Sequence, residues 1–229
     1  MTFELALRAT ELLLGLALLQ SSAEHLRDKG AIAALFLPRA MLSATLLAGI
    51  YTPWVLLALC VHSCAVLRRF GGPYNGGSDR MALLILYCVT AAHWLPTPQA
   101  QELALGYLGV QLVLSYFFSG EVKLRNPDWR NGQALSDVFR FSAYPVSGQV
   151  RTLAHRPQLL LCGSWAVIGF ELAFPLAIFQ AHLLCAALGV GLAFHLANAM
   201  LFGLNRFVWS WLAAYPSIIW LQTRIEQLI

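Results

Sequence analysis

Long apolar runs separated by short polar stretches dominate this sequence. A helix needs about 20 apolar residues to cross the hydrocarbon core of a membrane, somewhat fewer where flanking side chains reach the headgroups. Eight runs approach that length, at about 3–22, 37–50, 53–69, 81–96, 101–121, 157–178, 180–203 and 206–222. Only 11% of the 229 residues are charged, which is too few to cover a soluble fold with a solvated surface. The pattern predicts an all-α, polytopic membrane bundle of about eight transmembrane helices, forming one domain over residues 1–229.

The connections between the runs differ in length. Short turns at "GIYTPW", "LPTPQ" and "FQAH" join three pairs of runs, which favours helical hairpins. The longest connection, about 122–156, contains "NGQALSDVFRF", where Leu135, Val138 and Phe139 recur at helical spacing. This spacing predicts a short amphipathic helix lying in the membrane interface.

Basic residues are distributed unevenly over these connections. Lys and Arg number 15 in all. Most of them follow the first, third, fifth and seventh runs, namely Arg27, Lys29, Arg39, Arg68, Arg69, Arg80, Lys123, Arg125, Arg130, Arg140, Arg151, Arg156 and Arg206. The positive-inside rule assigns that side to the cytoplasm and leaves the N-terminus outside. A net charge of +4 in so apolar a chain therefore indicates how the helices are oriented in the membrane. We expect a lipid bilayer as partner and no nucleic acid.

The N-terminus and the cysteines exclude further classes. Glu4, Arg8 and Glu11 lie within the first 20 residues, and a basic leader is absent there, so we expect no cleaved signal peptide. All five cysteines lie inside apolar runs, which is typical of free buried thiols and not of a disulfide framework. Cys60 with Cys64, and His182 with Cys185, have helix-compatible ligand spacing, but no completing set lies nearby. We expect no metal.

The stretch "YFFSGEVKLRNPDWRNG", residues 116–132, places a lysine at the end of the fifth run. Tyr116 and Lys123 lie on one helical face. A lysine at membrane depth can donate hydrogen bonds, attract an anion, or act as a base when its amine is neutral. The alternative is that Lys123 only reaches out to the lipid headgroups.

Three further positions carry polar side chains at membrane depth. Glu171 lies near the middle of the sixth run, His195 and Asn198 lie three apart in the seventh, and His93 ends the fourth. A carboxylate in hydrocarbon must be protonated, paired or directed into a polar cavity. We expect Glu171 and His195 to share one polar cavity. The alternative for each histidine is an interhelical hydrogen bond.

A glycine-rich segment, "GGPYNGGSDRM", precedes the fourth helix. Its glycines permit close backbone approach, and Asn75 and Asp79 place polar groups at the membrane surface. These two residues are candidates for shaping a site. The alternative is a turn followed by an aspartate that starts a helix.

Three segments carry a resemblance to a known family, namely "YNGGSDR", "YFFSGEVKLRNPDWRNG" and "FHLANAMLFGL". Over about 3–222, the chain resembles the HTTM domain (horizontally transferred transmembrane domain) of vitamin K-dependent gamma-glutamyl carboxylase and its bacterial relatives. The resemblance implies that Lys123 is the base that deprotonates a reduced quinone, a vitamin K hydroquinone or a menaquinol-like molecule, before reaction with O2. It implies catalytic roles for Tyr116, Glu171 and His195. Asn75, Asp79, Trp129, Asn198 and His93 would shape the cofactor site.

Departures from the carboxylase leave alternatives open. That enzyme has a large additional domain that helps to present glutamate-containing substrates, whereas this chain ends just after its last helix, which puts carboxylation of glutamate in doubt. The carboxylase also reacts on the secretory side, whereas the arginine distribution places Lys123 on the cytoplasmic side.

Short HTTM proteins also resemble the membrane component that matures a sporulation-delaying peptide toxin, which works with a partner. The first hypothesis is therefore an enzyme of the bacterial inner membrane that modifies a peptide or small substrate brought by a partner protein. The second is a non-enzymatic maturation or immunity factor, and the third is a small transporter.

Overall fold

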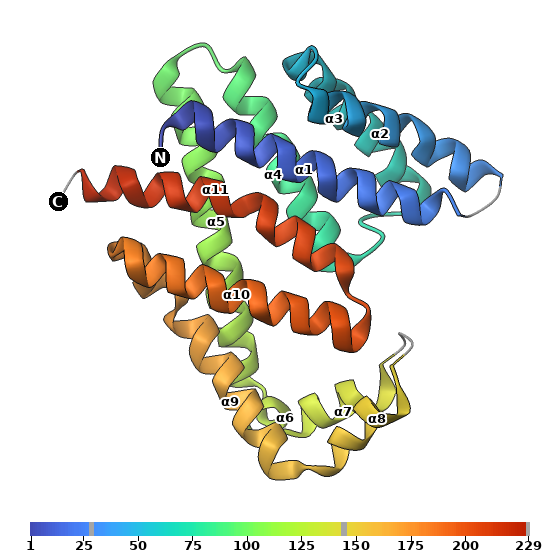
Figure 1. Ribbon diagram of the computed structural model, residues 1–229, viewed down its shortest axis with the longest axis vertical. Helices are drawn as coiled ribbons and strands as arrows, with labels where there is room; N and C mark the ends of the chain where they lie inside the picture. Colours follow the sequence, from blue (N-terminus) through green and yellow to red (C-terminus); the bar gives the residue numbers. More distant parts are fainter. Residues whose placement is uncertain (28–29, 143–145, 228–229) are drawn as a thin grey trace. The chain divides into compact units, whose positions relative to one another are not determined.

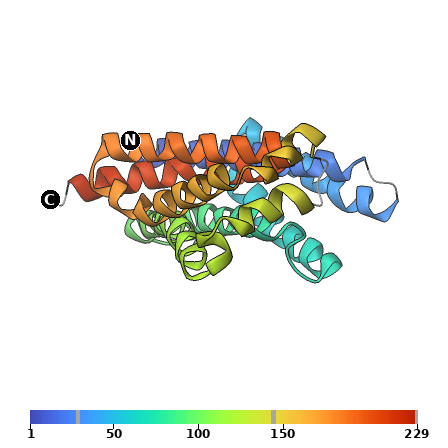
Figure 2. The same ribbon diagram turned by 90° about the horizontal axis from the view of Figure 1, so that it is seen from below.

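The computed structural model describes residues 1–27, 30–142 and 146–227, so Lys29 of the topology argument lies outside the described residues. All regular structure in the described part is helical (Figures 1 and 2). The elements are α1 (Phe3–His25), α2 (Ala31–Ala48), α3 (Thr52–Phe70), α4 (Gly76–Trp94), α5 (Pro98–Arg125), α6 (Pro127–Arg130), α7 (Gln133–Phe141), α8 (Gly148–Thr152), η1 (Leu153–His155), α9 (Pro157–Ala173), η2 (Phe174–Phe179), α10 (Ala181–Phe202) and α11 (Asn205–Glu226).

The predicted helices are confirmed as helices. Each of the eight apolar runs falls on one of the long helices α1 to α5 and α9 to α11. Five segments of the described chain are long and apolar enough to cross a membrane: α2, α3, α5, α9 together with η2, and α10. The fold class, a polytopic all-α membrane protein, is therefore confirmed, and the number of spans stays a prediction.

The second helix is longer than its apolar run suggests. The apolar run predicts a helix at about 37–50, whereas α2 begins at Ala31 and contains Pro38 in its interior. Proline removes one helical hydrogen bond, but neighbouring groups in a membrane bundle can satisfy the freed carbonyl. Arg39 lies inside α2, as it does inside the predicted run, so it does not belong to the connection to which the charge count assigned it.

The predicted amphipathic helix is α7, and α6, α8 and η1 complete the connection around it. Phe139 of α7 is buried in a small core with Ala154, Leu160 and Phe202, and its ring lies 5.1 Å from that of Phe202. Phe141, at the end of the same helix, is exposed. The position of α7 in the membrane interface stays a prediction.

The chain forms two compact units. Unit 1 contains residues 1–110 and 206–229, and unit 2 contains residues 111–205. Within unit 1, α1 packs against α2 and α4, and α3 packs against α2 and α4 (Figure 1). Within unit 2, α9 contacts η2, α6 and α7, and η2 contacts α10. The candidate site residues are thus divided between the two units.

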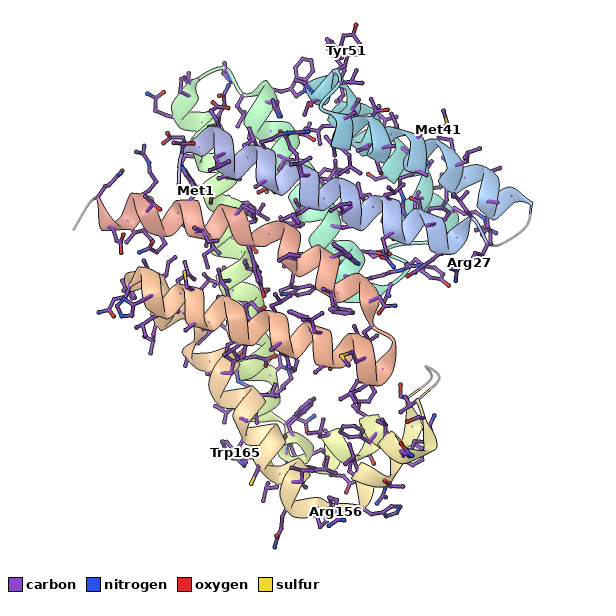
Figure 3. All side chains as sticks on the ribbon, viewed as in Figure 1. Met1, Arg27, Met41, Tyr51, Arg156 and Trp165 are labelled. Atoms are coloured by element: carbon purple, nitrogen blue, oxygen red, sulfur yellow. The ribbon has the colours of Figure 1, made fainter. Side chains whose placement is uncertain are left out.

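Many large apolar side chains point away from the helices into their surroundings. Met41 of α2 is 64% exposed and Tyr51, in the turn before α3, is 78% exposed, and both project outward in Figure 3. Water would disfavour so much exposed apolar surface, whereas lipid tails would cover it. The exposed surface therefore agrees with the membrane placement inferred from helix length.

Candidate functional site

A buried ion pair joins α5 to α9 in unit 2. The Lys123 ammonium donates to both carboxylate oxygens of Glu171, at 2.8 Å to Oε1 and 2.7 Å to Oε2. The Glu171 side chain is only 4% exposed and that of Lys123 is 18% exposed. Glu171 thus has the paired, buried position that a carboxylate at membrane depth requires.

Gly120 allows α5 and α9 to approach closely enough for this pair. A Cβ atom at position 120 would lie 2.9 Å from the Cβ of Glu171 and 2.9 Å from the backbone nitrogen of Leu172. Real Cβ atoms do not approach backbone that closely, so any side chain here would push the two helices apart. The glycine one turn before Lys123 is therefore part of the geometry of the pair.

A second polar contact lies about two turns earlier on the same face of α5. The hydroxyl of Tyr116 lies 3.1 Å from Nε2 of His195 on α10, and both side chains are buried. The Tyr116 ring stacks on Phe174 with centroids 4.1 Å apart and meets the ring of Phe170 edge-on at 5.6 Å. The segment that ends α9, residues 170–174, thus supplies both the carboxylate for Lys123 and the aromatic rings around Tyr116.

The chain after α5 is held against α9 by its backbone. Ser164 donates its hydroxyl to the carbonyl of Trp129 at 2.5 Å, and the indole N–H of Trp165 (labelled in Figure 3) donates to the carbonyl of Arg130 at 3.1 Å. These contacts place the Trp129 ring 5.2 Å from the Lys123 ammonium, within cation–π range. Trp129 therefore borders the ion pair.

Gly132 ends this segment and has a backbone conformation that other residues rarely adopt. Its φ is +81°, and a Cβ there would lie 3.0 Å from the backbone nitrogen of Leu161. Both the dihedral angle and the close approach favour glycine. Five residues of the segment "GEVKLRNPDWRNG" thus contact or closely approach α9: Gly120, Lys123, Trp129, Arg130 and Gly132.

The remaining predicted residues are not brought into this cluster by any contact within unit 2. Asn198 is half-buried on α10, three residues after His195. Asn75, Asp79 and His93 belong to unit 1, where the backbone N–H of Asn75 donates to Asp79 at 2.9 Å. The shared cavity that we expected for Glu171 and His195 stays a prediction, since each has a different partner from α5.

The partner of His93 was not predicted from the sequence. Nε2 of His93 lies 2.5 Å from Oε1 of Glu11, whose other oxygen accepts from Arg8 at 3.0 Å. Arg8 also donates to the carbonyls of Leu46 and Leu47 near the end of α2. Glu11 is a carboxylate inside the first apolar run, so the rule that singled out Glu171 would also have found it. Among the residues that the structure describes, no group of three His, Cys, Asp or Glu side chains could hold a metal ion.

The long apolar helices and the ion pair buried between two of them define the class: a polytopic helical membrane protein with a polar core. The chain belongs to the HTTM domain family, whose model matches residues 95–222, more than half of the 229 residues. The match includes Lys123, Trp129, Glu171 and His195, whereas the segment with Asn75 and Asp79 precedes it. The comparisons with curated proteins and with solved structures returned no match.

Proposed function

We propose that this protein is a membrane enzyme that uses a reduced quinone to modify a peptide or another small substrate. The observation that supports the proposal best is the buried pair of Lys123 and Glu171 in the family's segment of the chain. A carboxylate and an amine in direct contact can pass a proton between them. A pair needed only to hold helices together would be replaceable by apolar side chains.

The donor set of the site fits a hydroquinone. Lys123 and Glu171 offer groups that can accept a hydroxyl proton, and Tyr116 and His195 offer a second hydrogen-bonding pair. The half-buried rings of Phe170 and Trp129 add flat surfaces of the kind on which aromatic ligands stack. When bound, a hydroquinone would supply reducing electrons and an acidic hydroxyl for reaction with O2.

The residues of this chain would move the proton in two steps. Glu171 first takes a proton from the Lys123 ammonium, which leaves a neutral carboxylic acid and a neutral amine, a combination that a low-dielectric interior tolerates. The Nζ of Lys123 then accepts a proton from a hydroxyl placed against it. The pair as a whole gains one proton, which ends on Glu171.

The test is protein-dependent consumption of menaquinol in lipid nanodiscs. We expect nanodiscs that contain the protein to oxidise menaquinol in the presence of O2 faster than empty nanodiscs, and faster than nanodiscs with the Lys123→Ala variant. Equal rates in all three preparations would exclude quinol-dependent catalysis and favour the non-enzymatic alternative.

A further inference from the structure

The connection between α5 and α9 carries more basic residues than any other connection of the chain. Residues 122–156 contain six basic and two acidic side chains. Two more acidic side chains, Glu121 and Glu171, pair with members of this set, so the basic groups stay in excess. The connection follows one membrane-spanning helix and precedes the next, which places it at one surface of the bilayer. Within it, α7 packs against α6, α8 and η1 as well as α9, all of which belong to unit 2.

Three arginines of this connection have no acidic partner. Arg130, Arg140 and Arg156 are exposed, and among residues 1–27, 30–142 and 146–227 none of them forms an ion pair. The other three basic side chains of the connection already have partners within the protein, namely Lys123, Arg125 and Arg151. The three exposed arginines therefore leave positive charge available at the surface of unit 2.

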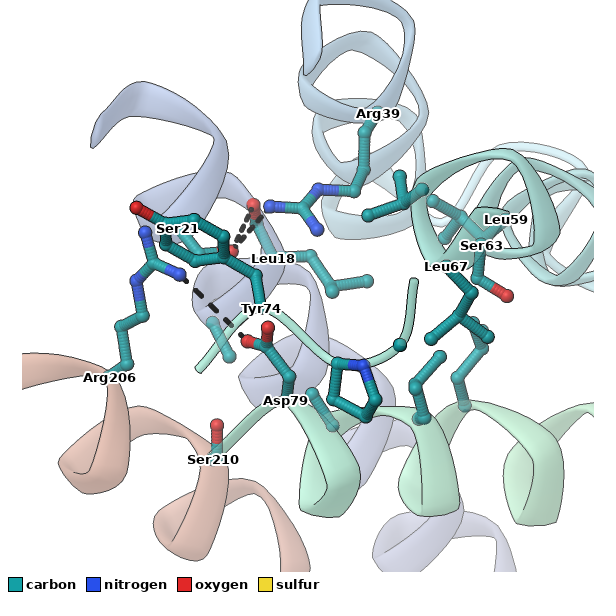
Figure 4. Close-up of a pocket in the computed structure, with 17 residues that line it drawn as sticks. Leu18, Ser21, Arg39, Leu59, Ser63, Leu67, Tyr74, Asp79, Arg206 and Ser210 are labelled. Atoms are coloured by element: carbon teal, nitrogen blue, oxygen red, sulfur yellow. Dashed lines mark hydrogen bonds and ion pairs between the residues drawn. The ribbon is translucent and has the colours of Figure 1, made fainter. Parts of the chain in front are cut away.

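The arginines that line the cavity of unit 1 are different, because their charge is balanced. Arg206 lies 2.6 Å from Glu24 and 3.9 Å from Asp79, and the dashed line in Figure 4 marks the second of these contacts. Arg39 lines the same cavity and donates to the hydroxyl of Ser22 at 2.8 Å. That cavity offers no excess charge to a ligand, whereas the connection in unit 2 does.

Each of the three exposed arginines has an exposed apolar or aromatic neighbour. The neighbours are Phe141, Leu159 and Trp165, which are 75%, 57% and 47% exposed. Phe141 directly follows Arg140, and Leu159 lies three residues after Arg156 in the sequence. The indole N–H of Trp165 donates to the backbone carbonyl of the arginine that ends α6, at 3.1 Å. Cations beside exposed apolar side chains are typical of the level at which headgroups meet acyl chains.

We infer that unit 2 binds anionic phospholipids of the bilayer that holds its helices. The binding surface, called the arginine surface below, comprises Arg130, Arg140, Arg156, Phe141, Leu159 and Trp165. The guanidinium groups donate to headgroup phosphates, and the apolar side chains contact the upper part of the acyl chains. An acidic protein in water would satisfy the arginines but leave the apolar side chains exposed, so the pattern favours lipid. The inference does not depend on the proposed quinol chemistry, because the arginine surface excludes Lys123 and Glu171.

Quenching of Trp165 fluorescence by brominated lipid tests this inference at the arginine surface itself. Phosphatidylcholine nanodiscs hold the full chain and a small fraction of phosphatidylglycerol or phosphatidylcholine with brominated acyl chains. The signal of Trp165 is the difference between a protein and the same protein with Trp165→Phe. We expect phosphatidylglycerol to bind at least about fivefold more tightly than phosphatidylcholine, the fold-change that corresponds to about 1 kcal/mol for one basic side chain at an anionic surface.

Salt provides a second measurement on the unchanged protein. Raising NaCl from about 0.1 M to about 1 M shortens the Debye length from about 10 Å to about 3 Å, so most of the preference for phosphatidylglycerol should be lost. Equal quenching by the two lipids at about 0.1 M NaCl would overturn the inference. If soluble polyglutamate bound the protein in that case, the surface would be assigned to an acidic partner protein instead.

Two matched variants identify the arginines. Arg130→Gln removes a cation without an acidic partner and should lower the preference for phosphatidylglycerol about fivefold. Arg125→Gln removes an exposed cation of the same connection that Glu121 already neutralises, so the preference should stay within about twofold of the wild type. A triple variant that adds Arg140→Gln and Arg156→Gln to Arg130→Gln should bind both lipids equally. An undiminished preference in the triple variant would contradict the assignment.

Discussion

Lys123→Arg is expected to lower menaquinol-dependent turnover on the order of 100- to 10,000-fold, the usual cost of losing one catalytic acid or base. Arginine keeps a positive charge beside Glu171, so the ion pair and the fold should persist. A guanidinium essentially never loses its proton in a protein, and it therefore cannot accept one from a substrate. The rate is measured in nanodiscs at equal amounts of folded protein.

The same assay contains its own control. Arg125, two residues later on α5, is 78% exposed and pairs with Glu121, so Arg125→Gln removes a cation from the same helix end without touching the buried pair. Its turnover should stay within about twofold of the wild type, because exposed ion pairs contribute little. Near-normal turnover in Lys123→Arg would leave this lysine as a structural partner of Glu171 and not a base.

Glu171→Ala is expected to destabilise the folded protein by about 3–5 kcal/mol, because it leaves the Lys123 ammonium partly buried without its partner. The side chain of Glu171 is only 4% exposed, so water cannot easily replace the lost carboxylate. The free energy of unfolding is measured in mixed micelles from tryptophan fluorescence. Trp129, 5.2 Å from the ammonium, lies within reach of the change.

A double variant separates stability from catalysis. Lys123→Met combined with Glu171→Leu replaces the pair by apolar side chains of similar size, which should recover most of the lost stability. If the pair only joins helices, the double variant should also keep its function. If the pair moves protons, turnover should stay as low as in Lys123→Ala despite the recovered fold. Loss of less than about 1 kcal/mol in Glu171→Ala would contradict the buried geometry.

Helix positions were predictable because the period and length of the apolar runs determine them. The beginning of α2 was not, since the predicted run starts at about residue 37, whereas the helix begins at Ala31 and continues through Pro38, which a membrane bundle tolerates inside a helix. Arg39 lies inside both the predicted run and α2, although the charge count assigned it to the connection after the first run.

The candidate site was predictable only in part. Lys123 and Glu171 were found because ionisable groups at membrane depth are costly. Their pairing was not foreseen, because it depends on the close approach of α5 and α9 at Gly120. Lys123 and Glu171 lie about 50 residues apart in the sequence, and local spacing does not predict such a contact. Local spacing gave one face of α5, with Tyr116 and Lys123, but not the identity of the helix that faces it.

Residues of unit 1 have partners that the sequence did not reveal. His93 was expected near a cofactor, which stays a prediction, and the structure shows that it pairs with Glu11 from the first helix. Asp79 was expected to shape the same site as Lys123, which also stays a prediction, and within unit 1 it contacts Asn75 and Arg206. Contacts between helices distant in sequence depend on how the bundle packs, and a single chain gives no pattern for that.

Infrared difference spectroscopy on adding menaquinol without oxygen tests the central claim most directly, because it observes the proton itself. Transfer from a bound hydroxyl to the pair of Lys123 and Glu171 should produce the C=O stretch of a protonated carboxylic acid, shifted in D2O and missing in Glu171→Gln. The Arg125→Gln variant should give the same band as the wild type. A quinol-bound spectrum in which Glu171 remains a carboxylate would contradict the claim that this pair accepts the proton.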